Sequence, residues 1–351
     1  EEGRPVVSRR YQFDTSFYYR PARLTVPSKA ASPAATAQAI ASLGVHDGYS
    51  LLFGATDGQL AAELARQISA DLILVEPDAT RIPNLRAALT ESGAQGIRAS
   101  VHHIPGTQLP YGDLIANLIV LSSQKPPTIP AAELHRVLRP SGGTFAVVGT
   151  DIDLPAYRKW LEGSPLAEAK AGSNPLLALA FTRGKLPGGG EWGHQYGGPD
   201  NSSCSQDELV KGDLQVAWWG DPGPRPMPDR GNRNPAPLSV NGRLFIQGNR
   251  ILFGLDAYNG SILWNWSAPE VRRANVTRDC SNMAASGDTL YLVHNKFCMA
   301  IDGQTGSRAR RFEVPRSGAN GPRDWSYVAA GRDLLIGSRV KPEGSYLGDD
   351  G

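Results

Sequence analysis

The sequence has 351 residues, with 36 Lys and Arg against 34 Asp and Glu, which gives a formal net charge of +2. So small a charge does not predict nucleic acid as a general partner, and no apolar run reaches the roughly 18 to 20 residues of a membrane-spanning helix. The 39 Gly and 27 Pro stay below the roughly 25–30% that is typical of low-complexity chains, so global disorder is excluded. At roughly 100 to 200 residues per domain, the length predicts two domains.

Residues 1–33 are rich in Arg, Tyr and Pro and are interpreted as a leader or as the remnant of an upstream region. From residue 34 to 187, helical periodicity alternates with short apolar runs. This pattern predicts βαβ units and a doubly wound, Rossmann-like α/β domain. The expected helices are 34–43, 59–69, 81–92 and 131–138, and the expected strands are 49–53, 71–75, 97–101, 114–121 and 144–148.

A second domain is predicted after the flexible joint Pro187-Gly-Gly-Gly190. Glycine-led apolar segments begin at Gly242, Gly287 and Gly331, which is a period near 45 residues. Such a period in a chain of short strands is typical of β-propeller blades, each of about four strands. Residues 188–351 suffice for roughly three to four blades, so we expect an all-β, incomplete propeller with an open final edge.

The loop Gly54-Ala55-Thr-Asp-Gly58 lies between an expected strand and an expected helix. Glycines there let the backbone approach a ligand, and the amides at the start of the helix favour a polar or anionic group. Glu76 ends the next strand, where a carboxylate can bind two ribose hydroxyls. The loop and Glu76 together predict a site for a nucleoside-containing cofactor. His102-His103 follows the third strand, and either an adenine contact by His103 or a structural histidine pair is compatible with the sequence.

These pieces resemble the Rossmann-like S-adenosylmethionine-dependent methyltransferases over roughly residues 34–149. The loop at Gly54 takes the place of that family's glycine-rich first motif, and Leu109-Pro-Tyr111 the place of its LPF segment. Glu133-Leu-His-Arg-Val-Leu-Arg-Pro-Ser-Gly-Gly143 is similar to its ERVLKPGG turn and is the most specific match. The resemblance implies S-adenosylmethionine as the cofactor, held by Gly54, Ala55, Gly58, Glu76 and His103.

Three positions depart from the family pattern. The acid of the first motif falls on Leu52, its central glycine on Thr56, and the aspartate before the fourth strand on Asn117. Leu52 cannot accept a hydrogen bond, and Thr56 adds a side chain where backbone approach is needed. The departures therefore predict a weakened cofactor site, and no catalytic residue can be named.

Residues 188–351 resemble the quinoprotein propellers that bind pyrroloquinoline quinone (PQQ). Glu191-Trp-Gly-His-Gln-Tyr196 and an expected first strand at Leu209–Trp218 resemble the opening of that family. Leu255-Asp-Ala-Tyr-Asn-Gly-Ser-Ile-Leu-Trp264 and Ile301-Asp-Gly-Gln-Thr-Gly306 resemble its repeated segment. The aspartates and glycines of this repeat are expected to shape turns, and Trp264 to pack between sheets.

The sequence does not predict PQQ or a metal, because vicinal cysteines are absent and the aspartates fall in turns. Cys204, Cys280 and Cys298 are too scattered for a zinc site, and one disulfide, Cys280 to Cys298, stays open. Arg308, Arg310 and Arg311 are compatible with phosphate binding or with a solvated face.

The leading hypothesis is a scaffold protein with a degenerate methyltransferase-like domain and a propeller that binds a protein or small molecule. The alternatives are an active S-adenosylmethionine-dependent methyltransferase and a PQQ-dependent oxidoreductase. The propeller favours a periplasmic or extracellular location, whereas an active methyltransferase would imply the cytoplasm.

Overall fold

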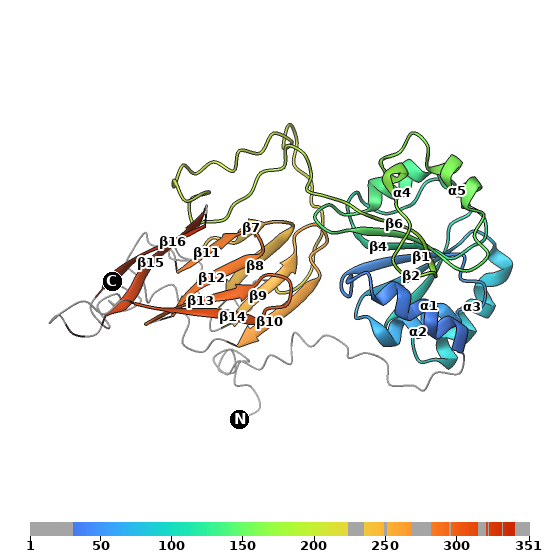
Figure 1. Cartoon of the computed structure of the whole chain (residues 1–351), viewed down its shortest axis with the longest axis horizontal. Coiled ribbons are helices and arrows are strands. Elements are labelled where there is room, and N and C mark those ends of the chain that lie inside the picture. The colour runs from blue at the N-terminus through green and yellow to red at the C-terminus, as the bar shows by residue number, and fades with distance from the viewer. Residues whose placement is uncertain are drawn as a thin grey trace, which may run out of the picture. The chain divides into compact units, whose positions relative to one another are not determined.

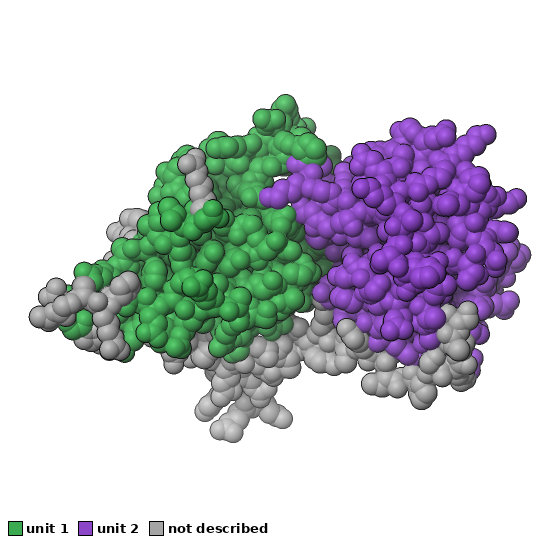
Figure 2. Space-filling model, viewed as in Figure 1, with its two compact units in different colours: residues 1–19, 187–351 green, residues 20–186 purple. Residues whose placement is uncertain are grey.

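The computed structural model describes residues 31–223, 235–248, 251–267, 282–294, 296–314, 321, 323–331 and 333–340. The chain divides into two compact units (Figure 2). Residues 20–186 form a unit that we call the α/β unit, and residues 187–351 belong to a second unit that we call the all-β unit. The expected leader lies outside the described residues up to residue 30.

The α/β unit is built around a six-stranded sheet with the strand order β3-β2-β1-β4-β5-β6 (Figure 1). The first five strands in sequence are parallel, and the sixth pairs antiparallel with β5. The strands are β1 (Tyr49–Phe53), β2 (Asp71–Glu76), β3 (Ala99–His103), β4 (Ala116–Leu121), β5 (Thr144–Val148) and β6 (Leu177–Thr182). The helices are α1 (Ala31–Ala41), α2 (Gln59–Gln67), α3 (Ile82–Glu91), α4 (Ala131–Val137) and α5 (Leu154–Leu161).

Helices cover both faces of this sheet because successive strand residues point to opposite sides. Leu52, Leu74 and Val120 belong to a core shared with α1, α2 and α3. Phe53, Val75 and their neighbours on the other face pack with α4 and α5. The predicted doubly wound α/β architecture is therefore present in the N-terminal half.

The structure differs from the expected elements in several places. Helix α5 and strand β6 were not predicted. The fourth strand begins at Ala116 rather than residue 114, since Leu114 has a left-handed φ of 62° that is incompatible with a strand. The third strand begins at Ala99, because residues 96–98 form a turn.

The described strands of the all-β unit form antiparallel sheets in chain order (Figure 1). The first two sheets have four strands each and the third has two. The repeated segments that begin at Gly242, Gly287 and Gly331 coincide with the second strand of each set. The elements are β7 (Leu238–Val240), β8 (Arg243–Gly248), β9 (Ile251–Asp256), β10 (Ile262–Ser267), β11 (Met283–Ser286), β12 (Thr289–His294), β13 (Phe297–Asp302), β14 (Arg308–Glu313), β15 (Asp324–Gly331) and β16 (Leu334–Val340). That these sheets belong to a propeller stays a prediction.

Apolar residues of neighbouring sheets share common cores. Phe245 and Leu252 of the first sheet pack in one cluster with Leu290 and Leu292 of the second. A further cluster joins the second sheet to Val328 of the third. The repeats therefore stack through their faces, which is how such units bury apolar surface that one sheet alone leaves exposed.

The strand expected at Leu209–Trp218 is wrong. These residues lie in an irregular segment with bends and without strand pairing among the described residues, and Leu214 and Val216 are exposed. The Asp207 carboxylate accepts hydrogen bonds from the Leu209 and Val210 N–H groups at 2.8 and 2.7 Å. The Trp218 indole Nε1 donates to the Ala257 carbonyl oxygen at 3.1 Å. A resemblance to a family's first strand is not enough here, because a strand also needs a hydrogen-bonding neighbour.

In the described part of the chain, no helix combines the length and the apolar character needed to cross a membrane.

Candidate functional site

The candidate site lies at the carboxyl ends of β1, β2 and β4 (Figure 1). The chain leaves β1 toward β2 on one side, whereas β4 pairs with β1 on the other. Strand order therefore reverses between β1 and β4. In open α/β sheets, ligands bind outside the carboxyl ends of the strands at such a switch point.

The loop after β1 is tied to the loop after β4. The Ser122 backbone N–H and hydroxyl both donate to the Phe53 carbonyl oxygen at 2.9 Å. Gly54 has a φ of +77°, and a Cβ on it would lie 2.7 Å from the Ser123 nitrogen. Only glycine therefore permits this close approach of the two loops.

The rest of the first loop leads directly into α2. Ala55 is buried, whereas Thr56 and Asp57 are exposed. The Asp57 carboxylate accepts a hydrogen bond from the Gln59 N–H at 3.0 Å, and Gly58 precedes the helix with a φ of 73°. The predicted strand, glycine-containing turn and helix are all present here.

Glu76 is 4% exposed and holds the turn after β2. Its Oε1 accepts a hydrogen bond from the Asp78 N–H at 2.9 Å, and its Oε2 lies 4.0 Å from Nη1 of Arg81. The Glu76 carboxylate thus stabilises the turn after β2 without a ligand. One bond to Oε1 leaves further acceptor capacity on both oxygens.

The strand register brings the predicted binding residues together. Phe53 pairs with Val75, so Gly54 and Glu76 follow at the same end of adjacent strands. Glu76 in turn pairs with His103 of β3. His103 is exposed, and its Nε2 lies 3.1 Å from the Pro77 carbonyl oxygen, so this nitrogen carries a proton.

Two positions that depart from the family pattern have side chains engaged elsewhere, one in the core and one at the amino end of the sheet. Leu52 is 1% exposed and packs in the core beneath α1, α2 and α3. Asn117 lies near the start of β4, where its Oδ1 accepts a hydrogen bond from the Tyr49 N–H at 3.1 Å. Asn117 therefore stabilises the amino end of the sheet, opposite the candidate site.

His102 forms a structural pair with Tyr111, a contact that the sequence did not predict. Its Nδ1 lies 2.9 Å from the Tyr111 hydroxyl, and its Nε2 lies 3.3 Å from the Ser100 hydroxyl. Burial raises the pKa of Tyr111 to about 12. Burial and the nearby Arg86 charge lower the pKa of His102. Both groups are therefore neutral near pH 7.

A polar network joins two of the three segments that resemble methyltransferase motifs. The Glu133 carboxylate accepts from the Leu109 N–H at 2.8 Å. The Arg136 guanidinium donates to the carbonyl oxygens of Leu109 (3.1 Å) and Tyr111 (2.9 Å), and it pairs with Glu133 and Asp113. The hydrogen bond to Arg136 is the main cause of a lowered Glu133 pKa. The network fixes the loop after β3 onto α4.

The unpredicted helix α5 fixes the loop after β4. Its buried Tyr157 donates to the Ser123 carbonyl oxygen at 2.9 Å, and Trp160 Nε1 donates to the Ile129 carbonyl oxygen at 3.1 Å. Lys125, on this loop, is exposed. The chain thus positions three loops around the carboxyl edge through contacts that are far apart in sequence.

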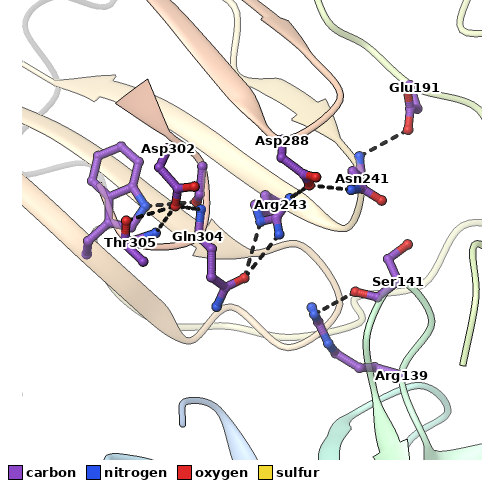
Figure 3. Close-up of polar contacts among 11 residues, drawn as sticks. Arg139, Ser141, Glu191, Asn241, Arg243, Asp288, Asp302, Gln304 and Thr305 are labelled. Carbon is purple, nitrogen blue, oxygen red and sulfur yellow. Dashed lines mark hydrogen bonds and ion pairs between the residues drawn. The ribbon is translucent and has the colours of Figure 1, made fainter. Parts of the chain in front are cut away.

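The turns of the all-β unit have the roles that the sequence predicted. Oδ1 of Asp302 accepts from the backbone N–H groups of Gln304 and Thr305 (Figure 3). Gly306 has a φ of +71°, and a Cβ there would lie 2.6 Å from the Trp264 ring. Trp264 Nε1 donates to the Gly303 carbonyl oxygen at 2.9 Å. These contacts connect β10 of one sheet to the turn of the next.

A second polar contact joins the same two sheets (Figure 3). Arg243 of β8 pairs with Asp288 at 2.6 Å and donates through Nη2 to the Gln304 side-chain oxygen at 3.2 Å. Asn241 also donates to Asp288 at 2.6 Å. These side chains are engaged with one another, so we interpret the cluster as structural.

Among the described residues, no group of three His, Cys, Asp or Glu side chains is placed to hold a metal ion. Cys298 is a buried free thiol. The disulfide that the sequence left open involves a second residue, Cys280, which lies outside the described residues.

Solved structures similar to this chain include S-adenosylmethionine-dependent methyltransferases. A protein of Methanococcus maripaludis, provisionally assigned as such an enzyme, is 13% identical, with a TM-score of 0.39, over 44% of this chain and 85% of its own. A methyltransferase of Aquifex aeolicus is 14% identical, with a TM-score of 0.34, over 43% of this chain and 88% of its own. An O-methyltransferase of Thermotoga maritima is 16% identical, with a TM-score of 0.34, over 49% of this chain and 71% of its own.

No protein-family model matches the chain, and no curated protein matches it.

Proposed function

We propose that this protein is a scaffold whose α/β unit has the form of a methyltransferase with a weakened cofactor site. The all-β unit is proposed to be part of a PQQ-type propeller that binds a partner. The observation that carries the first proposal is the place of Leu52. Where the resemblance calls for an acid, an apolar side chain is buried among α1, α2 and α3.

The remaining polar groups at the edge also support weak binding. Glu76 already accepts a backbone hydrogen bond, and Asp57 caps the first turn of α2. Thr56 places an exposed side chain in the loop where a ligand needs close access to the backbone. A bound nucleoside would therefore have to share or displace existing contacts.

Calorimetric titration of the full chain with S-adenosylhomocysteine tests the proposal. We expect no measurable heat at micromolar ligand. The variant Glu76→Gln keeps an acceptor oxygen for the Asp78 N–H but removes the negative charge that favours ribose hydroxyls. The exposed Glu162→Gln is the matched control for loss of one carboxylate.

A second function, active methyl transfer, is favoured by one observation: the buried Glu76 carboxylate lies at the end of β2 and next to Gly54 in the register. Micromolar binding that Glu76→Gln abolishes and Glu162→Gln leaves intact would support this alternative. That result would overturn the scaffold proposal.

A further inference from the structure

Strand β14 carries three arginines along one edge of a sheet. It is the last strand in the order β11-β12-β13-β14. Arg308, Ala309, Arg310 and Arg311 are all exposed. An edge strand with a row of cations is accessible to a partner, although such charges can also serve only to discourage aggregation.

A β-bulge decides which arginines share a face. Ile301 pairs with Arg308 and Ala300 with Arg310, so Ala309 is an extra residue on β14. Arg311 pairs with Met299, which lies two residues from Ile301 on β13. Arg308 and Arg311 therefore lie on one face of the sheet at a spacing of about 7 Å, and Arg310 lies on the other.

Aromatic rings hold the two guanidinium groups of this face. Arg308 lies over the Trp266 ring of the neighbouring sheet, 4.2 Å from its centroid, and Arg311 lies over the Phe297 ring at 4.1 Å. Stacking of this kind restricts the guanidinium groups while their N–H donors stay available at the edges. Less conformational entropy is then lost when an anion binds.

The charge on this edge favours an anionic partner. Within β14 one carboxylate, Glu313, offsets the three arginines, and it lies 3.4 Å from Nη2 of Arg311. Both side chains of that pair are more than half exposed, so the pair is weak and can exchange partners. The strand thus keeps an excess of positive charge.

We propose that this face of β14 binds an extended acidic peptide segment of a partner protein, with carboxylates on alternate residues placed against Arg308 and Arg311. Alternate side chains of an extended peptide lie about 7 Å apart, which matches the spacing of the two arginines. Arginine also presents paired donors that fit a carboxylate. The inference rests on the binding role proposed for the all-β unit, and it specifies the chemical class of the partner.

Nucleic acid fits this surface less well. Single strands bind proteins by stacking bases on aromatic faces beside a basic groove. Here the guanidinium groups of Arg308 and Arg311 already cover the Trp266 and Phe297 faces.

The bulge at Ala309 interrupts the regular hydrogen-bond ladder of β14, so peptide recognition depends on side chains. Because these side chains are charged, we expect peptide binding to weaken as the salt concentration increases.

The experiment measures fluorescence anisotropy of a short labelled peptide of alternating threonine and glutamate with the full chain. We expect salt-sensitive binding that becomes roughly tenfold weaker in the double variant Arg308→Gln/Arg311→Gln, because two exposed ion pairs are lost. Arg310→Gln is the matched control, since its side chain lies on the opposite face. Unchanged thermal unfolding midpoints verify that the variants fold.

Three outcomes overturn the proposal: no binding of the alternating peptide, equal loss in Arg310→Gln, or equal affinity for a peptide with glutamine in place of glutamate. Tighter binding of a single-stranded oligonucleotide than of the acidic peptide overturns it in favour of nucleic acid. Failure here is distinguishable from failure of the proposed function, because S-adenosylhomocysteine binding is measured at the α/β unit.

Discussion

His194 is a buried histidine whose ring is used as a hydrogen-bond acceptor. It is 3% exposed, and its Nε2 accepts from the Ala330 N–H at 3.0 Å. Its Nδ1 must then carry the proton, and that atom is buried without a hydrogen-bond partner among the described residues. Burial lowers the pKa of His194, and the nearby Asp200 charge opposes this shift.

The lowered pKa makes the His194 contact sensitive to acid. The folded protein holds the neutral ring more strongly than the unfolded chain does, so its stabilisation is complete above pH 6.5 and is lost as the pH falls through the folded-state pKa. We expect the hydrogen-exchange protection factor of the Ala330 amide to decrease on acidification. In His194→Gln, which keeps an acceptor but does not titrate, the decrease should be much smaller. An equal decrease in both proteins would contradict this explanation.

Arg136 is a second residue whose side chain makes several contacts, because it donates hydrogen bonds to two carbonyl oxygens of the loop after β3. Arg136→Ala removes hydrogen bonds to the Leu109 and Tyr111 carbonyl oxygens. We expect a loss of about 1–3 kcal/mol in the free energy of unfolding, measured by urea denaturation. Arg136→Lys retains the charge but not the fork of donors, so it should recover only part of the loss. Full recovery by lysine would mean that charge alone matters.

At the scale of elements, Trp264 belongs to the apolar cluster shared by the first two sheets of the all-β unit. The ring fills the space left by Gly254 and Gly306, where an added Cβ would lie 2.3 Å and 2.6 Å from it. The Trp264 ring therefore fits only because both neighbouring positions are glycine.

Replacing Trp264 should therefore destabilise the sheets. We expect Trp264→Ala to cost about 3–5 kcal/mol, since it removes a buried ring and leaves a cavity. Trp264→Phe retains most of the volume and loses the hydrogen bond to Gly303, so a cost of about 1–2 kcal/mol is expected. Differential scanning calorimetry measures both. Similar costs for the two variants would show that packing is not the main contribution.

The β14 surface also belongs to the element scale. Residue numbering alone would place Arg308 and Arg310 on one face, since strand side chains alternate. The bulge at Ala309 moves Arg311 onto that face instead. The predicted contrast between Arg311 and Arg310 in peptide binding is therefore a test of this register as well as of the partner.

At the scale of the whole molecule, the two units differ in how their strands are paired and connected. The α/β unit is organised by parallel strands with helical crossovers, whereas the all-β unit is organised by repeated antiparallel hairpins. Domains of this kind generally have their own cores. We therefore expect calorimetry to show Trp264→Ala lowering the transition of the all-β unit and leaving that of the α/β unit unchanged. A shift of both transitions would indicate that the units unfold together.

The sequence predicted the alternation of strands and helices and the repeat near 45 residues, because periodicity and turn residues are local properties. It also selected Gly54, Glu76 and His103, which the strand register brings to one edge. It missed α5 and β6 and wrongly expected a strand at Leu209–Trp218. In the last case, the expectation came from the resemblance to the quinoprotein opening, and a resemblance does not specify strand pairing.

What the sequence determined by itself, then, was the kind of each element and the residue types at the end of each strand. Tertiary structure alone decided that Leu52 is a core residue, that Asn117 lies at the opposite end of the sheet from Glu76, and that Arg311 shares a face with Arg308. The physical reason is that these properties depend on strand pairing and on packing between segments that are distant in the chain. Local periodicity specifies neither the partner nor the register of a strand.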